Sequence, residues 1–411
     1  MSTTRRRFLG QLGAAGLLSV GSLPPEFLCR AARAAEQAKS DGRILVLVEL
    51  EGGNDGLNTV IPFGDDEYYK ARPGLGVDRD QILKLDDYHG LHPRLAGLKS
   101  LYDEGRLAVL QGVGYPNPDR SHFRSMDIWH SAEPERETFD RGWLGRTLDA
   151  QVGAADAQAP ALALGVQRLP LALVASKINV PAVSDLSAYR LEVGSGSSEL
   201  QAARRKLLSE LAERNDQTGG ELDFLRQTAL TAYRSAERLR SVTEGYKAAA
   251  EYPASGLGAR LKLIAQIIAS GLETRIFFVS LSGFDTHSQQ AAAHQLLLAE
   301  LGDAVQAFHK DLAGHGLAER VMLVTFSEFG RRVKENGSLG TDHGAASQMF
   351  VMTPLTGGIV GKHPSLTDLT DGDLIHHTDF RAVYATLLER WLGLPSEPVL
   401  GGKFAPLTFA G

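Results

Sequence analysis

Short, continuous apolar runs recur along the chain, and each ends in glycine or polar residues. The clearest runs cover residues 43–50, 106–114, 274–283 and 320–328. Because a strand that is buried on both faces is apolar at successive positions, these runs predict strands of a parallel sheet. Stretches with helical periodicity lie between them, over residues 93–105, 289–316 and 379–393. This alternation predicts an α/β fold, in which helix layers cover a central, mostly parallel sheet.

Two segments depart from this alternation. Residues 197–250 are rich in charge and contain two amphipathic patterns separated by the sequence DQTGG. They predict a helical insertion on the sheet scaffold. Residues 151–161 are rich in alanine and predict a surface loop.

The N-terminus has the pattern of an export signal. Arg5 and Arg6 resemble the paired arginines of the twin-arginine motif, and a short Gly/Ala-rich apolar segment follows them. An A-x-A-like cleavage site lies at 32–34, and the only cysteine, Cys29, precedes it. The apolar segment is too short for a permanent membrane span. We therefore expect a signal peptide over 1–34 and a single α/β domain over 35–411. The twin-arginine machinery would export this domain to the periplasm or the extracellular space.

Composition excludes several classes of protein. Hydrophobic content of 43% and charged content of 22% are typical of a globular protein. A net charge of −6, without a basic stripe interleaved with aromatic residues, argues against nucleic-acid binding. The sequence lacks the G-x-S-x-G, Walker A, G-x-G-x-x-G and H-E-x-x-H motifs, which disfavours classical serine hydrolases, nucleotide-binding folds and zincins.

Candidate chemical groups follow each predicted strand, and in open α/β sheets ligands bind beyond the carboxyl ends of the strands. They are Asn54 and Asp55 after the first strand, Arg120, Ser121 and His122 after the second, Asp285 and His287 after the third, and Glu328, Arg331, Asp342 and His343 after the fourth. Each also has an ordinary structural explanation. The alternatives include a turn at Asp55, a helix cap at Ser121, a hydrogen bond between Asp285 and His287, and an ion pair between Glu328 and Arg331.

Together these groups suit a metal-dependent hydrolase. Divalent ions accept a mixture of carboxylate oxygen and imidazole nitrogen, and two ions about 3.5–4 Å apart can activate a nucleophile and bind a leaving oxygen. A hydroxyl group can attack directly, and an arginine can hold the oxyanion. His89 and His92 precede Pro93 and are expected at the start of a helix, with lining of the site as the alternative.

Several segments together resemble the bacterial domain of unknown function 1501 over nearly the whole chain after residue 34. They include LEGGNDGLNTVIPF, GVGYPNPDRSHFRSMDIW, SGFDTHSQQ, TFSEFGRRVKENGSLGTDHG and TDFRAVYATLLERWLG. That family is similar to the alkaline phosphatase and sulfatase superfamily. The resemblance implies an alkaline phosphatase-like α/β sandwich with a two-metal site at the strand ends, and it agrees with a twin-arginine leader.

The resemblance also implies roles for individual residues. Asp55, Asp342 and His343 would bind one divalent ion, and Asp285, His287 and His377 (or its neighbour His376) would bind the other. The ions would be Zn, Mn, Mg or Ca. Ser121 would be the nucleophile, with Arg120 or Arg331 holding the oxyanion. No C-x-P-x-R motif is present, so the usual arylsulfatase chemistry is not expected.

The leading hypothesis is an exported metal-dependent hydrolase that acts on a phosphate or sulfate ester of a small molecule or polysaccharide. One alternative is a non-catalytic envelope protein that uses the same scaffold for binding. Another is a hydrolase with one metal or none that uses Ser121 and a neighbouring histidine.

Overall fold

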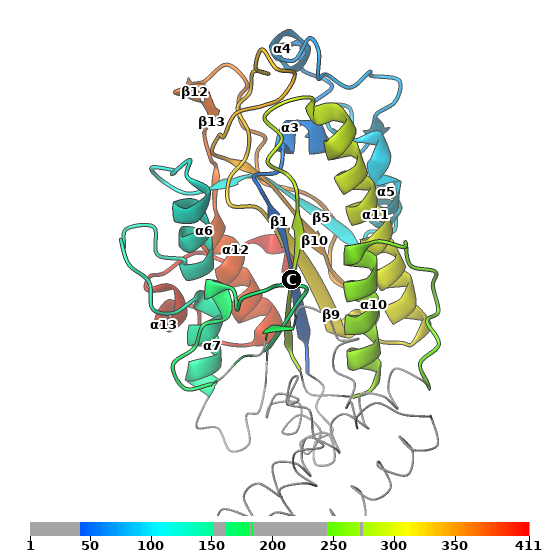
Figure 1. Cartoon of the computed structure of the whole chain (residues 1–411), viewed down its shortest axis with the longest axis vertical. Helices are drawn as coiled ribbons and strands as arrows, with labels where there is room; N and C mark the ends of the chain where they lie inside the picture. Colours follow the sequence, from blue (N-terminus) through cyan, green and yellow to red (C-terminus); the bar gives the residue numbers. More distant parts are fainter. Residues whose placement is uncertain are drawn as a thin grey trace, which may run out of the picture. The chain divides into compact units, whose positions relative to one another are not determined.

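The computed structural model describes residues 42–151, 161–178, 180, 182–183, 245–271 and 274–410 (Figure 1). The chain divides into two compact units, one formed by Lys39–Ser184 with Lys247–Gly411 and the other by Met1–Ala38 with Asp185–Tyr246. The expected signal peptide and nearly all of the expected helical insertion lie outside the described residues and stay predictions. The following description concerns the first unit.

A nine-stranded sheet forms the centre of this unit, in the order β11-β5-β10-β9-β1-β8-β6-β7, with β14 also paired to β5. Every pair is parallel except those of β10, which runs antiparallel to β5 and β9. The strands are β1 (Ile44–Glu51), β5 (Leu107–Gly114), β6 (Ala161–Leu164), β7 (Ala182–Val183), β8 (Ile276–Ser282), β9 (Val321–Phe326), β10 (Ser347–Met352), β11 (Gly358–Val360) and β14 (Thr378–Asp379).

The four predicted strands are confirmed as β1, β5, β8 and β9. All eight residues of β5 and all six of β9 are buried, and only the last residue of β1 and of β8 is exposed. Continuous apolar sequence therefore corresponds to burial on both faces. The expected loop over 151–161 meets described structure only at its two ends, since Gln151 ends a helix and Ala161 begins β6.

Helices cover both faces of the sheet (Figure 1). On one face are α6 (His122–Ser131), α7 (Trp143–Gln151), α12 (Phe380–Thr386), a π-helical segment (Leu387–Leu392) and α13 (Glu397–Leu400). Their apolar side chains share one core cluster with residues of β1, β5, β8, β9 and β10. The predicted α/β class, with a mostly parallel sheet between helix layers, is confirmed.

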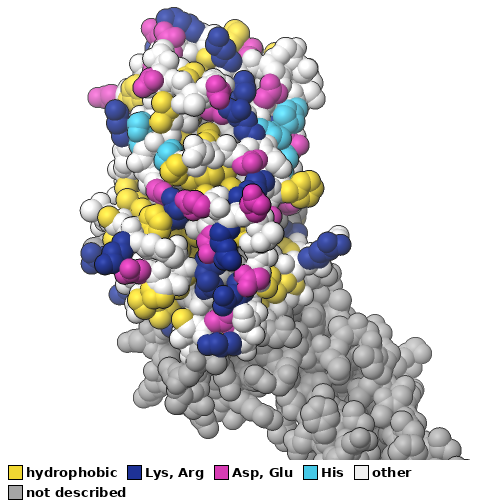
Figure 2. All heavy atoms as spheres, turned by 90° about the vertical axis from the view of Figure 1, so that its left-hand side faces the viewer, with side chains coloured by type: hydrophobic (Ala, Val, Ile, Leu, Met, Phe, Trp, Pro, Cys, Tyr) yellow, Lys and Arg dark blue, Asp and Glu magenta, His cyan; other side chains and the backbone are white. Residues whose placement is uncertain are grey.

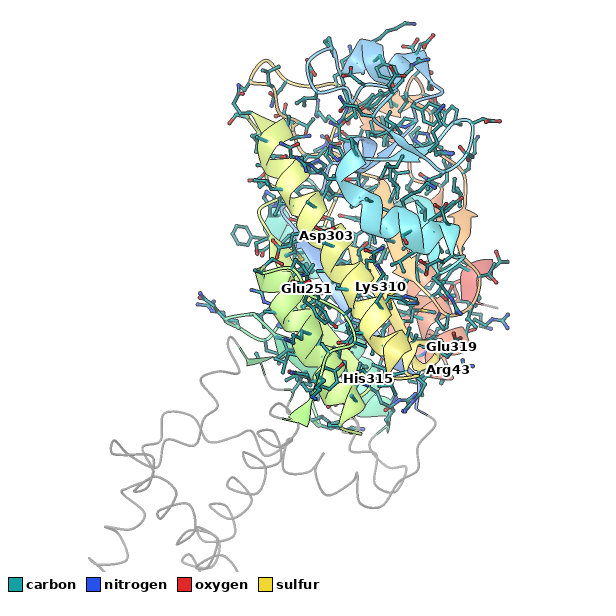
Figure 3. The ribbon with its side chains drawn as sticks, turned by 90° about the vertical axis from the view of Figure 1, so that its right-hand side faces the viewer. Arg43, Glu251, Asp303, Lys310, His315 and Glu319 are labelled. Carbon is teal, nitrogen blue, oxygen red and sulfur yellow. The ribbon has the colours of Figure 1, made fainter. Side chains whose placement is uncertain are left out.

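The opposite face carries α5 (Ala96–Asp103), α10 (Gly256–Ala269) and α11 (Gln290–Gly314), and Figure 3 shows α10 and α11 side by side. Asp303 and Lys310 of α11 are exposed, whereas Leu301 and Phe308 are fully buried. The predicted helix over 289–316 therefore has the expected amphipathic arrangement.

A smaller group of elements lies beyond the carboxyl ends of the strands (Figure 1). It comprises α3 (Gly56–Thr59), α4 (Asp66–Ala71), the three-stranded sheet β2-β4-β3, formed by Val60–Ile61, Gly90–Leu91 and Leu83–Lys84, and the hairpin β12–β13, formed by Leu369–Thr370 and Asp373–Leu374. A second apolar cluster joins α3, α4 and this hairpin. Among the described residues, no helix is long and apolar enough to cross a membrane.

Candidate metal centre

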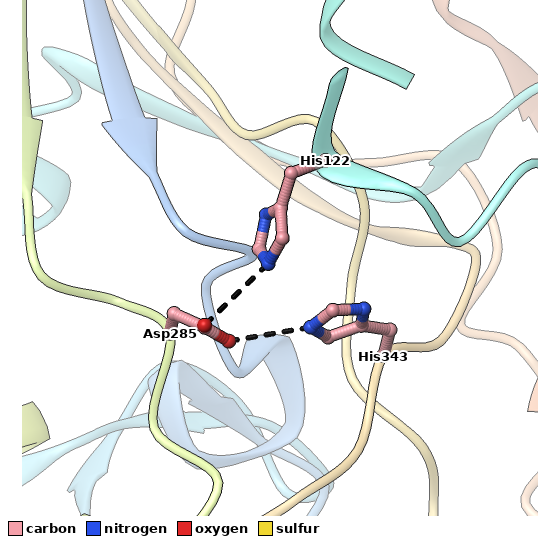
Figure 4. A group of neighbouring side chains, drawn as sticks. All are labelled: His122, Asp285 and His343. Carbon is pink, nitrogen blue, oxygen red and sulfur yellow. Dashed lines mark hydrogen bonds and ion pairs between the residues drawn. The ribbon is translucent and has the colours of Figure 1, made fainter. Parts of the chain in front are cut away.

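Three side chains from distant parts of the sequence converge where the strands end: His122 at the start of α6, Asp285 after β8 and His343 between β9 and β10 (Figure 4). One ligand atom from each lies within 4.8 Å of the other two. The distance from His122 Nε2 to Asp285 Oδ2 is 3.5 Å, and that from His343 Nε2 to Asp285 Oδ1 is 3.2 Å. Imidazole nitrogen and carboxylate oxygen suit a divalent metal ion, so the donor set fits a cation.

The Nδ1 atoms of both histidines are held by oxygen acceptors. His122 Nδ1 lies 2.9 Å from Glu328 Oε1, and His343 Nδ1 lies 2.8 Å from the Arg120 carbonyl oxygen. Because a carboxylate and a carbonyl oxygen can only accept, each Nδ1 carries the hydrogen. Each Nε2 therefore presents its lone pair toward Asp285. Metal-binding histidines are typically oriented in this way.

A third imidazole, that of His287, completes the arrangement. Its Nδ1 atom is 3.3 Å from Asp342 Oδ1, and its Nε2 atom is 2.9 Å from His343 Nε2 and 3.1 Å from Asp285 Oδ1. With both Nδ1 atoms donating, the two Nε2 lone pairs face each other, and an additional proton or a cation must separate them. Burial lowers the pKa of His343, which disfavours an additional proton on that ring. The two nitrogen atoms are therefore placed so that one cation could contact both.

Asp285 supplies negative charge at the centre of the group. Its Oδ1 atom accepts a hydrogen bond of 2.8 Å from Arg331 Nη2. Burial raises the pKa of Asp285, but the hydrogen bond and the positive charge of Arg331 outweigh it, and the pKa is lowered to about 2. The carboxyl group is therefore ionised over the whole physiological range.

Arg331, which the resemblance offers as a residue that holds the oxyanion, lies behind Asp285. Its side chain is completely buried. Besides Asp285, its guanidinium group donates to the backbone carbonyl oxygens of Gly52, Gly53, Phe284 and Thr341. Arg331 therefore joins the ends of β1 and β8 to the loop before His343, and it positions Asp285 from behind.

Close backbone packing brings the Asp285 loop to the end of β1. A Cβ atom on Gly52 would lie 2.4 Å from the Asp285 nitrogen, and Gly52 has a φ of +117°. Only glycine fits this conformation and this contact without strain. Gly52 therefore allows the turn at the end of β1 to contact the backbone of the loop that carries Asp285.

Arg120 and Ser121 lie beside the group. The guanidinium group of Arg120 binds Asp373 on β13, with an Nε–Oδ2 distance of 2.7 Å. Ser121 occupies the N-cap position of α6, but its exposed side chain makes no capping hydrogen bond. The Ser121 hydroxyl group is therefore not occupied by the helix-capping role that the sequence allows.

Asp55 and His377 lie apart from the converging ligands. Asp55 is fully buried and binds Arg72 Nη1 and Gln290 Nε2, each at 2.5 Å. Burial raises the pKa of Asp55, but the charge and hydrogen bond of Arg72 outweigh it and the pKa lies below its usual value. His377 directly precedes β14, and its backbone nitrogen donates to the Gly112 carbonyl oxygen at 2.9 Å. Among the described residues, neither belongs to the cation-binding group.

His122 was not among the predicted ligands, whereas Asp285, His287, Asp342 and His343 do meet at one place. Its position could have identified His122 as a ligand, since the first residue of the helix after β5 lies at the edge where the strands end. The predicted role of His92 at a helix start is confirmed: it caps the 3₁₀ helix Pro93–Leu95, and its Nδ1 atom accepts from the Arg94 nitrogen at 3.1 Å. Histidine, acidic and basic side chains share the upper end of the face in Figure 2.

Solved structures resemble this chain weakly. The PsFucS1 sulfatase from Pseudoalteromonas sp. is 14% identical, with 91% of this chain and 74% of the sulfatase covered and a TM-score of 0.38. A protein in the alkaline phosphatase superfamily from Vibrio parahaemolyticus is 8% identical, with 84% and 72% covered and a TM-score of 0.33. The alkaline phosphatase from the Antarctic bacterium TAB5 is 8% identical, with 78% and 95% covered and a TM-score of 0.31.

The fold of this chain is defined by its sheet topology, with a mostly parallel sheet between two helix layers. No curated protein matches the sequence. The family model described as "Protein of unknown function (DUF1501)" matches residues 108–391, which is more than half of the chain, and the chain therefore belongs to that family.

Proposed function

We propose that this protein is a metal-dependent hydrolase of phosphate or sulfate esters. The observation that carries the proposal is the set of three imidazole Nε2 atoms, from His122, His287 and His343, directed at the carboxylate of Asp285. A divalent cation bound there would supply Lewis-acid polarisation of an ester oxygen and a lowered pKa for a coordinated hydroxyl group or water.

The surrounding residues suit such a substrate. The side chains of Asp285 and His287 are 47% and 45% exposed, so a ligand can reach the centre from solvent. Ser121 is exposed next to His122 and is the candidate nucleophile. Arg120, 37% exposed, lies beside His343 and can bind an anionic group once its pairing with Asp373 loosens. The ester class also follows from the motifs that resemble the alkaline phosphatase and sulfatase superfamily.

One cation would bind at this centre, because the converging donors among the described residues form one group. Asp342 then orients His287 through its Nδ1 atom, and Asp55 stabilises the end of β1 through Arg72. These roles differ from direct ligation, which the resemblance implies for both aspartates.

The test combines metal analysis with an activity panel. We expect the purified protein to contain one tightly bound divalent ion and to hydrolyse an aryl phosphate or an aryl sulfate. Chelation should abolish that activity, and one of Zn²⁺, Mn²⁺, Mg²⁺ or Ca²⁺ should restore it. Asp285→Asn should lose both ion and turnover, whereas His309→Gln on α11 should keep both.

A folded protein that holds no ion and ignores chelators would refute the proposal. A protein that binds the ion through Asp285 but turns over no ester in a broad panel would support the non-catalytic binding alternative. Loss of activity in Ser121→Ala, with the ion retained, would assign the nucleophile.

We also propose that residues 1–34 direct export by the twin-arginine route to the periplasm or beyond. Replacing Arg5 and Arg6 together by lysine should leave a fused reporter in the cytoplasm. Continued export of that variant would contradict this assignment.

A further inference from the structure

A second pair of imidazoles lies apart from the candidate metal centre. His89 precedes β4 of the small sheet, and His363 follows β11 in the chain. Their ring centroids are 5.3 Å apart, with an angle of 49° between the ring planes. The Tyr88 ring contacts both rings edge-on, at centroid distances of 4.8 Å from His89 and 5.6 Å from His363.

Three nitrogen atoms of this pair lack hydrogen-bond partners. They are Nε2 of His89 and both ring nitrogens of His363, and all three are shielded from solvent. A neutral imidazole has one N–H group and one lone pair, so His363 can offer an unused lone pair. Leaving a buried polar atom without a partner costs about 1–3 kcal/mol. A ligand bound to these nitrogen atoms would remove that cost.

Asp86 orients the first ring. Its carboxylate oxygens lie 3.0 and 3.2 Å from His89 Nδ1, and Oδ1 also accepts from the Tyr88 nitrogen at 2.8 Å. Because the carboxylate can only accept from this ring, Nδ1 of His89 carries the hydrogen and Nε2 presents a lone pair. This Asp–His arrangement is the one that typically supports a metal ligand.

We propose that His89 and His363 together bind a divalent transition-metal cation such as Zn²⁺. Imidazole suits Zn²⁺, Ni²⁺ and Cu²⁺, and two rings whose centroids are 5.3 Å apart and whose lone pairs are unused can supply two ligands to one ion. The ion would have a structural role, because it would link the small sheet β2-β4-β3 to the segment between β11 and β12. It needs no group from the candidate metal centre, so it stands or falls independently of the proposed hydrolase activity.

Zinc titration of metal-stripped protein tests this in a factorial design. We expect two Zn²⁺ equivalents in the full chain, one in Asp285→Asn, one in His363→Gln and none in the double variant. His89→Gln should bind Zn²⁺ at the second site at least tenfold more weakly. His309→Gln, which removes a half-buried histidine outside both sites, should bind two equivalents.

Equal zinc stoichiometry in His363→Gln and the unsubstituted protein would overturn the proposal. If the substituted proteins do not fold, a crystal of the full chain soaked in Zn²⁺ decides the question. An anomalous peak between the His89 and His363 rings supports the site. Density for an ordered water alone at that position overturns it.

Discussion

At the scale of single residues, the candidate metal centre depends on the groups that hold each imidazole by its Nδ1 atom. Glu328 is the most strongly fixed of these groups. Its side chain is fully buried, and its Oε1 atom accepts from the Gly52 nitrogen at 2.9 Å as well as from His122. A charge held in this position keeps the lone pair of His122 Nε2 directed at Asp285.

Glu328→Gln should therefore weaken cation binding without unfolding the protein. The amide oxygen can still accept from Gly52, but the negative charge beside His122 is lost. We expect affinity to fall about 10–100-fold, as for other outer partners of metal ligands, when measured by titration of metal-stripped protein. Glu319→Gln changes an exposed glutamate and serves as the matched control. Equal affinity in both variants would contradict this role.

His294 gives the protein a predictable acid sensitivity. This buried residue of α11 binds Asn54, with a distance of 2.9 Å between Nε2 and Oδ1, and burial lowers its pKa to about 4 from an ordinary 6.5. Between those values the unfolded chain binds a proton that the folded chain does not. Stability due to this group is therefore complete above pH 6.5 and is lost as pH falls toward 4, by up to roughly 3 kcal/mol.

His294→Gln should reduce this dependence. Denaturant unfolding at pH 7 and pH 4.5 should show a smaller difference in the free energy of unfolding than in the unsubstituted protein. Some difference should remain, because burial also lowers the pKa of His92 and His363 to about 4. An undiminished difference would show that His294 does not titrate in this way.

At the scale of elements, the loop between β9 and β10 positions His287. Asn336 Nδ2 donates to the His287 carbonyl oxygen at 2.9 Å and to Asp342 Oδ1 at 3.1 Å. A Cβ atom on Gly340 would lie 2.2 Å from the His287 carbonyl carbon. The loop therefore packs backbone against backbone, and His287 reaches the centre only because residue 340 has no side chain.

Gly340→Ala should weaken cation binding although it alters no ligand, because the methyl group must displace the backbone of His287. We expect a loss of affinity of about tenfold, the lower end of the effect of outer-shell changes. Gly337→Ala in the same loop is the control, since nothing lies within 4 Å of the added Cβ atom. Similar affinities in the two variants would contradict this reading of the loop.

At the scale of the whole molecule, a bound cation would join α6, the loop after β8 and the loop before β10. Binding to the folded state alone stabilises a protein by about 2.7 kcal/mol when the ligand is at 100 times its Kd. We expect this order of increase in the free energy of unfolding for the metal-loaded protein. In Asp285→Asn the increase from this centre should vanish. Equal stabilisation of the two proteins would place the ion elsewhere.

The sequence predicts the central architecture because burial on both faces leaves a local trace. β1, β5, β8 and β9 are continuous apolar runs, and their ends meet at one edge because β1, β8 and β9 are parallel neighbours. β10 was not predicted. Its polar residues Ser347 and Gln348 are buried by tertiary contacts, so their burial has no signature in a local apolar pattern.

Local sequence is sufficient to predict the α/β class and the edge of the sheet that carries the candidate chemistry, whereas it divides Asp285 and His287 from Asp342 and His343 between two ions. Both predictions follow from strand periodicity and from the polar residues that come after each strand. Which side chains face one another depends on contacts between segments that are distant in the sequence. Arg72 reaches Asp55 from the end of α4 and neutralises it, while the start of α6 brings His122 to Asp285. Ion pairs and packing between distant segments decide such contacts, and local sequence does not encode them.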